Sequence, residues 1–167
     1  MFQSSKQRII SRIIFSVYFI LLVWLILFKF ATSLSELPSI RGINLIPFYY
    51  EQETNIHSKE VLYNILVFIP LGIYIQVLRE NWKIPVKGMV ILLTSLLFEA
   101  VQFIFAIGAS DITDLIGNTV GGVIGILFCV LMKKVIPKKF ISLINSVGIL
   151  MEAIVLVLLA LLLVANR

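Results

Sequence analysis

Five apolar stretches, each about as long as a bilayer is thick, constrain the fold of this chain more than any other feature. They cover residues 9–30, 61–78, 88–107, 115–132 and 140–164. A water-soluble fold would alternate apolar and polar positions around one core, whereas 60% of this chain is apolar and its mean hydropathy is +1.06. Because a backbone in hydrocarbon must satisfy its own hydrogen bonds, we predict an all-α integral membrane bundle of about five transmembrane helices.

The basic residues predict how the bundle is oriented. Most of the 14 Lys and Arg residues lie in the N-terminal arm and first helical turn or in the segments 79–87 and 133–139. The positive-inside rule then places the N-terminal arm, residues 1–8, in the cytoplasm and, with five spans, the C-terminus outside. Residues 31–60 become an external loop. The net charge of +5 reflects this topology and attraction to membrane lipids, so we expect no nucleic-acid partner.

Cysteine and histidine are too scarce for several kinds of site. The chain has one cysteine, Cys129, and one histidine, His57. A disulfide framework within the chain and a metal cluster built on His or Cys are therefore excluded, and we expect no metal and no cofactor.

Polar residues occur at helical spacing in two neighbouring apolar stretches. Ser95, Glu99 and Gln102 follow the spacing i, i+4, i+7 and share one face of the third helix. On the fourth helix, Asp111, Asp114 and Asn118 share a face at i, i+3, i+7. Side chains of this kind are costly in hydrocarbon, so both faces are predicted to point toward protein.

Glycines on the fourth helix support the same conclusion. Gly117, Gly121 and Gly125 form two overlapping GxxxG patterns, which let a neighbouring backbone approach closely. We predict helix packing at these three glycines, either within the chain or across a homodimer. Because the stretch begins with aspartates and is rich in glycine, the sequence leaves open whether the fourth helix spans fully or is partly re-entrant.

The predicted depth of the polar residues indicates a pocket. Asn64 enters the second helix from the outer side, and the polar residues of the third and fourth helices also fall in the outer half of the membrane. A polar pocket that opens outward between helices two, three and four explains this agreement. Asp111 has an alternative role as the N-cap of helix four with Asp114 at N3, and Asn64 and Gln102 have one as interhelical hydrogen-bond partners. Glu152 in the fifth stretch has no polar neighbours at helical spacing, and the sequence gives it no role.

Four motifs occur in an order and spacing that resemble a known family. They are NLIPF at residues 44–48, YNILVFIPLG at 63–72, ExxQ at 99–102 and DITDLIGNTVGGVIG at 111–125. The stretch 44–132 thus resembles the VanZ-like family of multi-pass proteins of the bacterial cytoplasmic membrane. For some members, the resemblance implies a link with resistance to lipoglycopeptide antibiotics of the teicoplanin type. Many relatives carry an arginine just before the first aspartate of the last motif, where this chain has Gly108, Ala109 and Ser110.

Two functional hypotheses follow. In the first, the pocket binds a lipid-linked envelope precursor or an acylated glycopeptide, or alters the access of the antibiotic to the membrane. In the second, the chain is a membrane enzyme acting on a lipid-linked envelope precursor, with Glu99, Asp114 and Asp111 as catalytic candidates. We favour binding, because the sequence has no phosphate-binding glycine loop and no nucleophile paired with histidine. The predicted ligand-binding residues are Asn44, Asn64, Glu99, Gln102, Asp111, Asp114 and Asn118.

Overall fold

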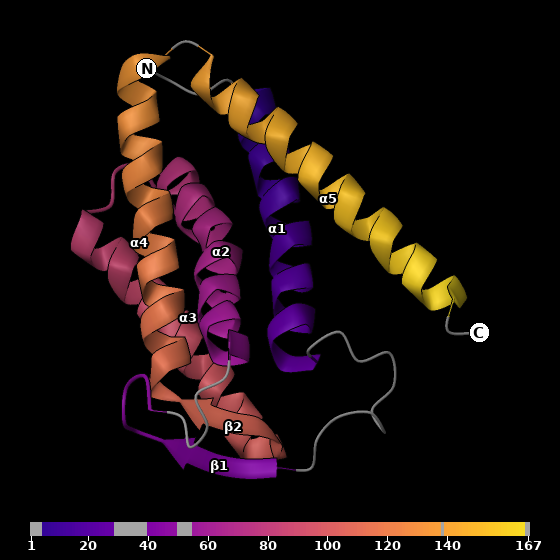
Figure 1. The fold of residues 1–167 in the computed structure, drawn as a ribbon. Helices are drawn as coiled ribbons and strands as arrows, with labels where there is room; N and C mark the ends of the chain where they lie inside the picture. The colour runs from indigo at the N-terminus through magenta and orange to yellow at the C-terminus, as the bar shows by residue number, and fades with distance from the viewer. Residues whose placement is uncertain (1–4, 29–39, 50–54, 138, 166–167) are drawn as a thin grey trace.

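The computed structural model describes residues 5–28, 40–49, 55–137 and 139–165, and its main elements are five long helices. All five are long and apolar enough to cross a bilayer, which confirms the predicted all-α bundle. Figure 1 shows α1 to α4 packed together, whereas α5 runs obliquely away from them toward the C-terminus. The helices are α1 (Ser5–Phe28), α2 (Asn55–Leu78), α3 (Ile84–Phe105), α4 (Ile112–Val135) and α5 (Phe140–Ala165).

Two short strands, which the sequence did not predict, pair at one end of the bundle. β1 (Ile40–Asn44) runs parallel to β2 (Ile107–Asp111), with Asn44 opposite Asp111 in the register. They lie at the end opposite the turn between α4 and α5 (Figure 1). Part of the predicted external loop therefore forms a β-strand, and this strand places Asn44 beside the N-terminus of α4.

The helix boundaries differ from the predicted ones for local reasons. α3 ends at Phe105 rather than at residue 107, because Ala106 adopts a left-handed conformation with φ 54° and ψ 34°. α4 begins at Ile112 rather than at residue 115, because Asp111 caps it. α2 begins at Asn55, six residues before the predicted span. α4 is one continuous helix of 24 residues, long enough to span a bilayer.

Glycines bring α2 and α4 into backbone contact. A Cβ added at Gly121 would lie 2.8 Å from the carbonyl carbon of Ile65, and one at Gly125 would lie 3.0 Å from that of Ile69. On the facing helix, a Cβ at Gly72 would lie 2.7 Å from the carbonyl carbon of Gly122. The sequence left open whether the glycine face of α4 packs within the chain or across a homodimer. In the structure α2 of the same chain covers this face.

Large apolar side chains fill the space among the first four helices. Phe68 and Phe98 meet edge to face, with ring centroids 6.2 Å apart. The main buried cluster consists of Leu22, Leu27, Phe68, Leu71, Ile75, Ile91, Phe98 and Ile126. These residues hold α1 to α4 in fixed positions around the polar residues described below.

A small polar cluster joins α5 to α1. Asn145 donates from Nδ2 to Gln7 Oε1 at 2.8 Å, and Ser11 Oγ lies 2.9 Å from Asn145 Oδ1. Most large side chains of α5 are exposed, from Leu143 to Val164. An apolar helix with so little protein around it is suited to lipid.

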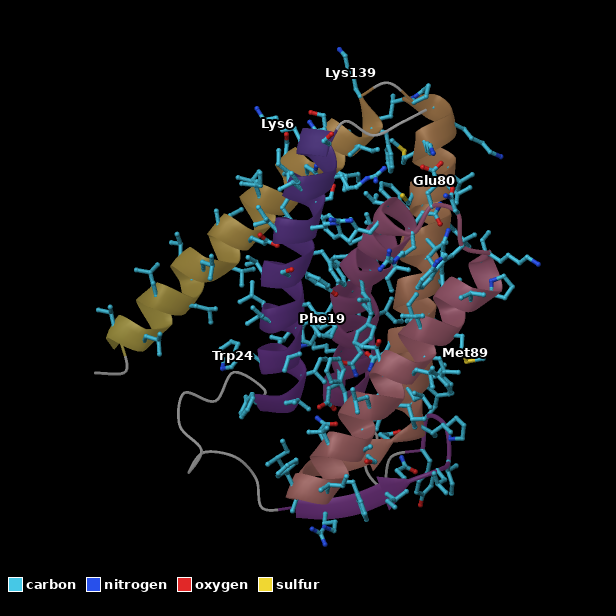
Figure 2. The ribbon with its side chains drawn as sticks, turned by 180° about the vertical axis from the view of Figure 1, so that it is seen from behind. Lys6, Phe19, Trp24, Glu80, Met89 and Lys139 are labelled. Carbon is cyan, nitrogen blue, oxygen red and sulfur yellow. The ribbon has the colours of Figure 1, made fainter. Side chains whose placement is uncertain are left out.

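Basic side chains extend from the end of the molecule opposite β1. Figure 2 shows Lys6 and Lys139 at that end, with Glu80 in the same half of the molecule. Glu80 also forms an ion pair with Lys133 near the end of α4. The loops that the sequence assigned to one side of the membrane are therefore together in space, and the cytoplasmic location of that end stays a prediction.

Candidate functional site

A cavity of about 540 Å³ lies among α1, α2, α3 and α4. α1 contributes apolar side chains to its wall, whereas the other three helices contribute polar ones. Five of the seven predicted ligand-binding residues line it. The described lining residues are Leu25, Ile26, Glu60, Tyr63, Asn64, Val67, Glu99, Gln102, Asp114 and Asn118.

Several polar side chains of α3 and α4 are buried in the protein rather than directed to lipid. The exposed fractions are 6% for Glu99, 4% for Gln102 and 1% for Asn118. Gln102 donates from Nε2 to the carbonyl oxygen of Ile26 at 3.0 Å, a contact with α1 that spacing along the chain does not suggest. Asn118 donates from Nδ2 to Ser95 Oγ at 2.9 Å, so the two predicted polar faces meet.

Asn44 and Asp111, the other two predicted ligand-binding residues, are not among the lining residues. They form a tie between β1 and the start of α4, in which Asn44 Nδ2 donates to Asp111 Oδ2 at 3.1 Å. Asn44 also accepts a hydrogen bond from the backbone N–H of Ile46 at 3.1 Å and donates to the carbonyl oxygen of Tyr49 at 3.2 Å. With these contacts Asn44 shapes the turn after β1 and fastens it to α4.

Asp111 connects this turn to the cavity. Its Oδ1 accepts from the backbone N–H of Thr113 at 2.7 Å, which is N-cap geometry, and Asp114 falls in the first turn of the helix. The backbone N–H of Asp111 donates to Glu99 Oε2 at 2.9 Å. Thr113 Oγ1 accepts from the N–H of Phe48 at 3.0 Å. Glu99 therefore both lines the cavity and fastens α3 to the start of α4.

Several participating residues were missed by sequence reasoning. Glu60, Tyr63 and Asn64 share a face of α2 at the spacing i, i+3, i+4, so helical periodicity contained the signal for the first two. Thr113 and Ser110 gave no such signal, because their contacts are set by the strand pairing and the cap. Ser110 Oγ donates to the backbone oxygen of Glu99 at 2.7 Å.

The one described cation on β1 is already engaged near the end of α3. Arg41 donates from Nε to the oxygen of Phe103 at 3.2 Å and from Nη2 to that of Ile104 at 3.1 Å. Its guanidinium also lies over the Phe103 ring, 5.4 Å from the centroid. A cation at a helix C-terminus satisfies carbonyl groups that the helix leaves without donors. In the register, Arg41 faces Gly108.

The chemistry available in the cavity is that of carboxylates and amides beside an apolar wall. Among its described lining residues, three are acidic and none is basic. Within the described part of the chain, no three or more His, Cys, Asp or Glu side chains group as a candidate metal site. The arrangement can hold an apolar chain against α1 and α2 while amide and carboxylate oxygens accept hydrogen bonds from a polar group.

The cavity lies within the part of the chain that matches a known protein family. A model of the VanZ/LLP1 family matches residues 15–133, which include every lining residue named above. Protein VanZ of Enterococcus faecium is 39% identical over 154 residues, which cover 90% of this chain and 92% of that protein. No solved structure matches the chain.

Proposed function

Because this chain belongs to the VanZ/LLP1 family, we propose that it is a multi-pass protein of the bacterial cytoplasmic membrane that confers or modulates resistance to lipoglycopeptide antibiotics. In this proposal the cavity opens toward the outer leaflet. It binds a lipid-linked envelope molecule or an acylated glycopeptide, or alters the access of the antibiotic to the membrane surface. The observation that carries the proposal is the cavity itself, in which polar side chains from three helices surround one space.

The size and the lining of the cavity support an amphiphilic ligand. Its volume of about 540 Å³ lies within the range of small-molecule sites. Leu25, Ile26 and Val67 form an apolar wall that suits an acyl chain, whereas Asn64 and Gln102 provide amides for a polar head. A ligand with only one of these two parts would leave half of the lining unmatched.

The structural hydrogen bond that Glu99 accepts favours binding over catalysis. Its Oε2 accepts the backbone N–H of Asp111, and this contact holds two helix ends together. An amide in place of the carboxylate can accept the same hydrogen bond, but it cannot exchange a proton as an acid or base. An enzyme acting through Glu99 and Asp114 is the alternative, and the substitution Glu99→Gln separates the two.

Antibiotic susceptibility of cells tests the proposal. The chain is expressed in a susceptible bacterium, and the inhibitory concentration is measured for a teicoplanin-type lipoglycopeptide and for a glycopeptide that lacks the acyl chain. We expect the wild-type chain to raise the first value several-fold. Asn64→Leu, which removes a polar group from the lining, should lose most of that effect.

Leu62 provides the matched control on the same helix. Its side chain is 51% exposed and is not among the lining residues, so Leu62→Ala should keep the wild-type effect. All variants are compared at equal amounts of protein in the membrane. The proposal fails if the wild-type chain gives no protection, or if Asn64→Leu protects as well as Leu62→Ala.

A further inference from the structure

The end of β1 and the turn after it expose a run of large apolar side chains. We call residues 43–49 the apolar turn, and no residue in it is charged. Five of its side chains are between 53% and 71% exposed, namely those of Ile43, Leu45, Ile46, Phe48 and Tyr49. Such a run of exposed apolar side chains is costly in water and marks a surface that contacts a membrane or another protein.

Hydrogen bonds hold the apolar turn in shape against the start of α4. Asn44 Oδ1 accepts from the N–H of Ile46, and the N–H of Phe48 donates to Thr113 Oγ1 in the first turn of α4. Phe48 also has a φ of 58°, which is uncommon for a bulky residue and persists only where the surrounding contacts impose it. The apolar side chains are therefore held outward by a fixed backbone.

The contact with α4 also sets the depth of the apolar turn. The 24 residues of α4 extend about 36 Å, which exceeds the hydrocarbon thickness of about 30 Å, so the ends of the helix reach the head groups. Phe48 is bonded to the first turn of α4, and Figure 1 shows the turn after β1 beside the lower end of that helix. The exposed side chains thus lie at the level where head groups meet acyl chains.

The chemistry of the apolar turn fits lipid better than protein. A protein interface combines an apolar centre with a polar rim and about one hydrogen bond per 100–200 Å². The exposed side chains of residues 43–49 offer one polar group, the Tyr49 hydroxyl, because the amide of Asn44 is bonded within the turn and to Asp111. Tyrosine is enriched where a bilayer meets water, because its ring suits acyl chains and its hydroxyl suits head groups.

We propose that the apolar turn is a membrane anchor, which inserts its apolar side chains among the acyl chains just below the head groups beside the start of α4. In the proposed orientation these belong to the outer leaflet. The anchor also acts on the cavity, because Asn44 binds Asp111, whose N–H donates to Glu99 Oε2 in the cavity lining. It holds that end of the cavity at a fixed depth. The inference goes beyond the proposed function, since it requires neither a cavity ligand nor antibiotic resistance.

The test measures how deep the apolar turn lies in a bilayer. In the full chain with Cys129→Ala, a nitroxide label is attached at Leu45→Cys or, separately, at Ile46→Cys. Each chain is placed in phosphatidylcholine nanodiscs, one copy in each. Collisions of the label with oxygen, which concentrates in hydrocarbon, are compared with collisions with a water-soluble nickel chelate. Ile124→Cys, exposed at the middle of α4, is the control for lipid, and Lys139→Cys, exposed between α4 and α5, is the control for water.

We expect both labels in the turn to lie about 5–10 Å below the lipid phosphates, with a nickel collision rate several-fold below that at position 139. Nickel access equal to that at position 139 would overturn the inference, because the turn would then lie in water. Low access to both reagents would overturn it as well, because protein rather than lipid would then cover the turn. Each labelled chain must melt at the temperature of the unlabelled Cys129→Ala chain, and antibiotic susceptibility judges the proposed function separately.

Discussion

The contact between α2 and α4 allows a graded test on a single helix face. Gly117, Gly121 and Gly125 are spaced by four residues, but an added Cβ meets different surroundings at each. At Gly117 it would lie 3.6 Å from the oxygen of Val61, an ordinary contact distance. At Gly121 it would lie 2.8 Å from the carbonyl carbon of Ile65, so the helices must separate by more than about 0.6 Å to reach normal contact.

The expected cost follows from this difference. Overpacking of a well-packed contact destabilises by about 1–3 kcal/mol, and the obstructing atoms at Gly121 belong to backbone, which cannot rotate away. Gly117→Ala should be neutral or stabilising by up to about 1 kcal/mol, because alanine is the better helix former. Gly88→Ala in α3, where no atom lies within 4 Å of the added Cβ, is a second control.

Thermal unfolding of the purified chain in one detergent measures the effect. For a chain of this length, 1 kcal/mol corresponds to a shift of roughly 2–4 °C in Tm. We expect Gly121→Ala to unfold several degrees below wild type, and Gly117→Ala and Gly88→Ala at or slightly above it. Equal melting temperatures for Gly117→Ala and Gly121→Ala would refute the backbone contact between α2 and α4.

Three further comparisons of variants test the polar contacts. Glu99→Gln should keep most of the protection against the antibiotic, because the amide still accepts a hydrogen bond from the N–H of Asp111. Glu99→Leu should lose the protection. Complete loss in both variants at equal expression would favour the enzyme hypothesis, in which Glu99 exchanges a proton. Asn44→Asp should destabilise the chain, because it places a second carboxylate beside that of Asp111. In a thermal double-mutant cycle, adding Asp111→Asn should restore about 1 kcal/mol of the free energy of unfolding. Strictly additive effects would contradict the hydrogen bond between Asn44 and Asp111. Asn145→Leu should lower the melting temperature by several degrees, because it removes the hydrogen bonds to Gln7 and Ser11 of α1. The exposed control Ser146→Ala should not lower it. Similar melting temperatures for the two variants would show that these hydrogen bonds contribute little to stability.

The helices of this chain were predictable because a bilayer limits the choices. A long apolar stretch in hydrocarbon must satisfy its backbone internally, so length and composition alone gave five helices. Periodicity then placed Glu99 and Gln102 on one face and Asp114 and Asn118 on another. The structure places all four around one cavity. Helical spacing therefore predicted neighbours within each helix, and the shared depth predicted that the helices would bring them together.

The contacts of β1 were not predictable in this way. Strands of five residues give a weak periodic signal, and the pairing of Asn44 with Asp111 joins positions 67 apart in the sequence. The contact of Gln102 with the oxygen of Ile26 is also long-range, because the partners are 76 positions apart in the sequence. Such pairings depend on how the helices pack, so local spacing could not predict that Asn44 and Asp111 fasten the turn after β1, and their contact with a ligand stays a prediction.

The polar residues of the segment from Phe98 to Asn118 divide into two groups by how they are satisfied. Asp111 uses both carboxyl oxygens and its N–H within the protein, and Gln102 donates to a backbone oxygen of α1. Hydrogen bonds of this kind offset the cost of placing polar groups in a membrane, so the fold accounts for the presence of these two residues there, and their contact with a ligand stays a prediction. Asn118 differs, because one half of its amide is bonded to Ser95 and the other half accepts nothing from the described residues. A fold gains no stability from a buried oxygen without a donor, so the hydrogen bonds of the described residues account for Asp111 and Gln102 but not for the Asn118 amide oxygen.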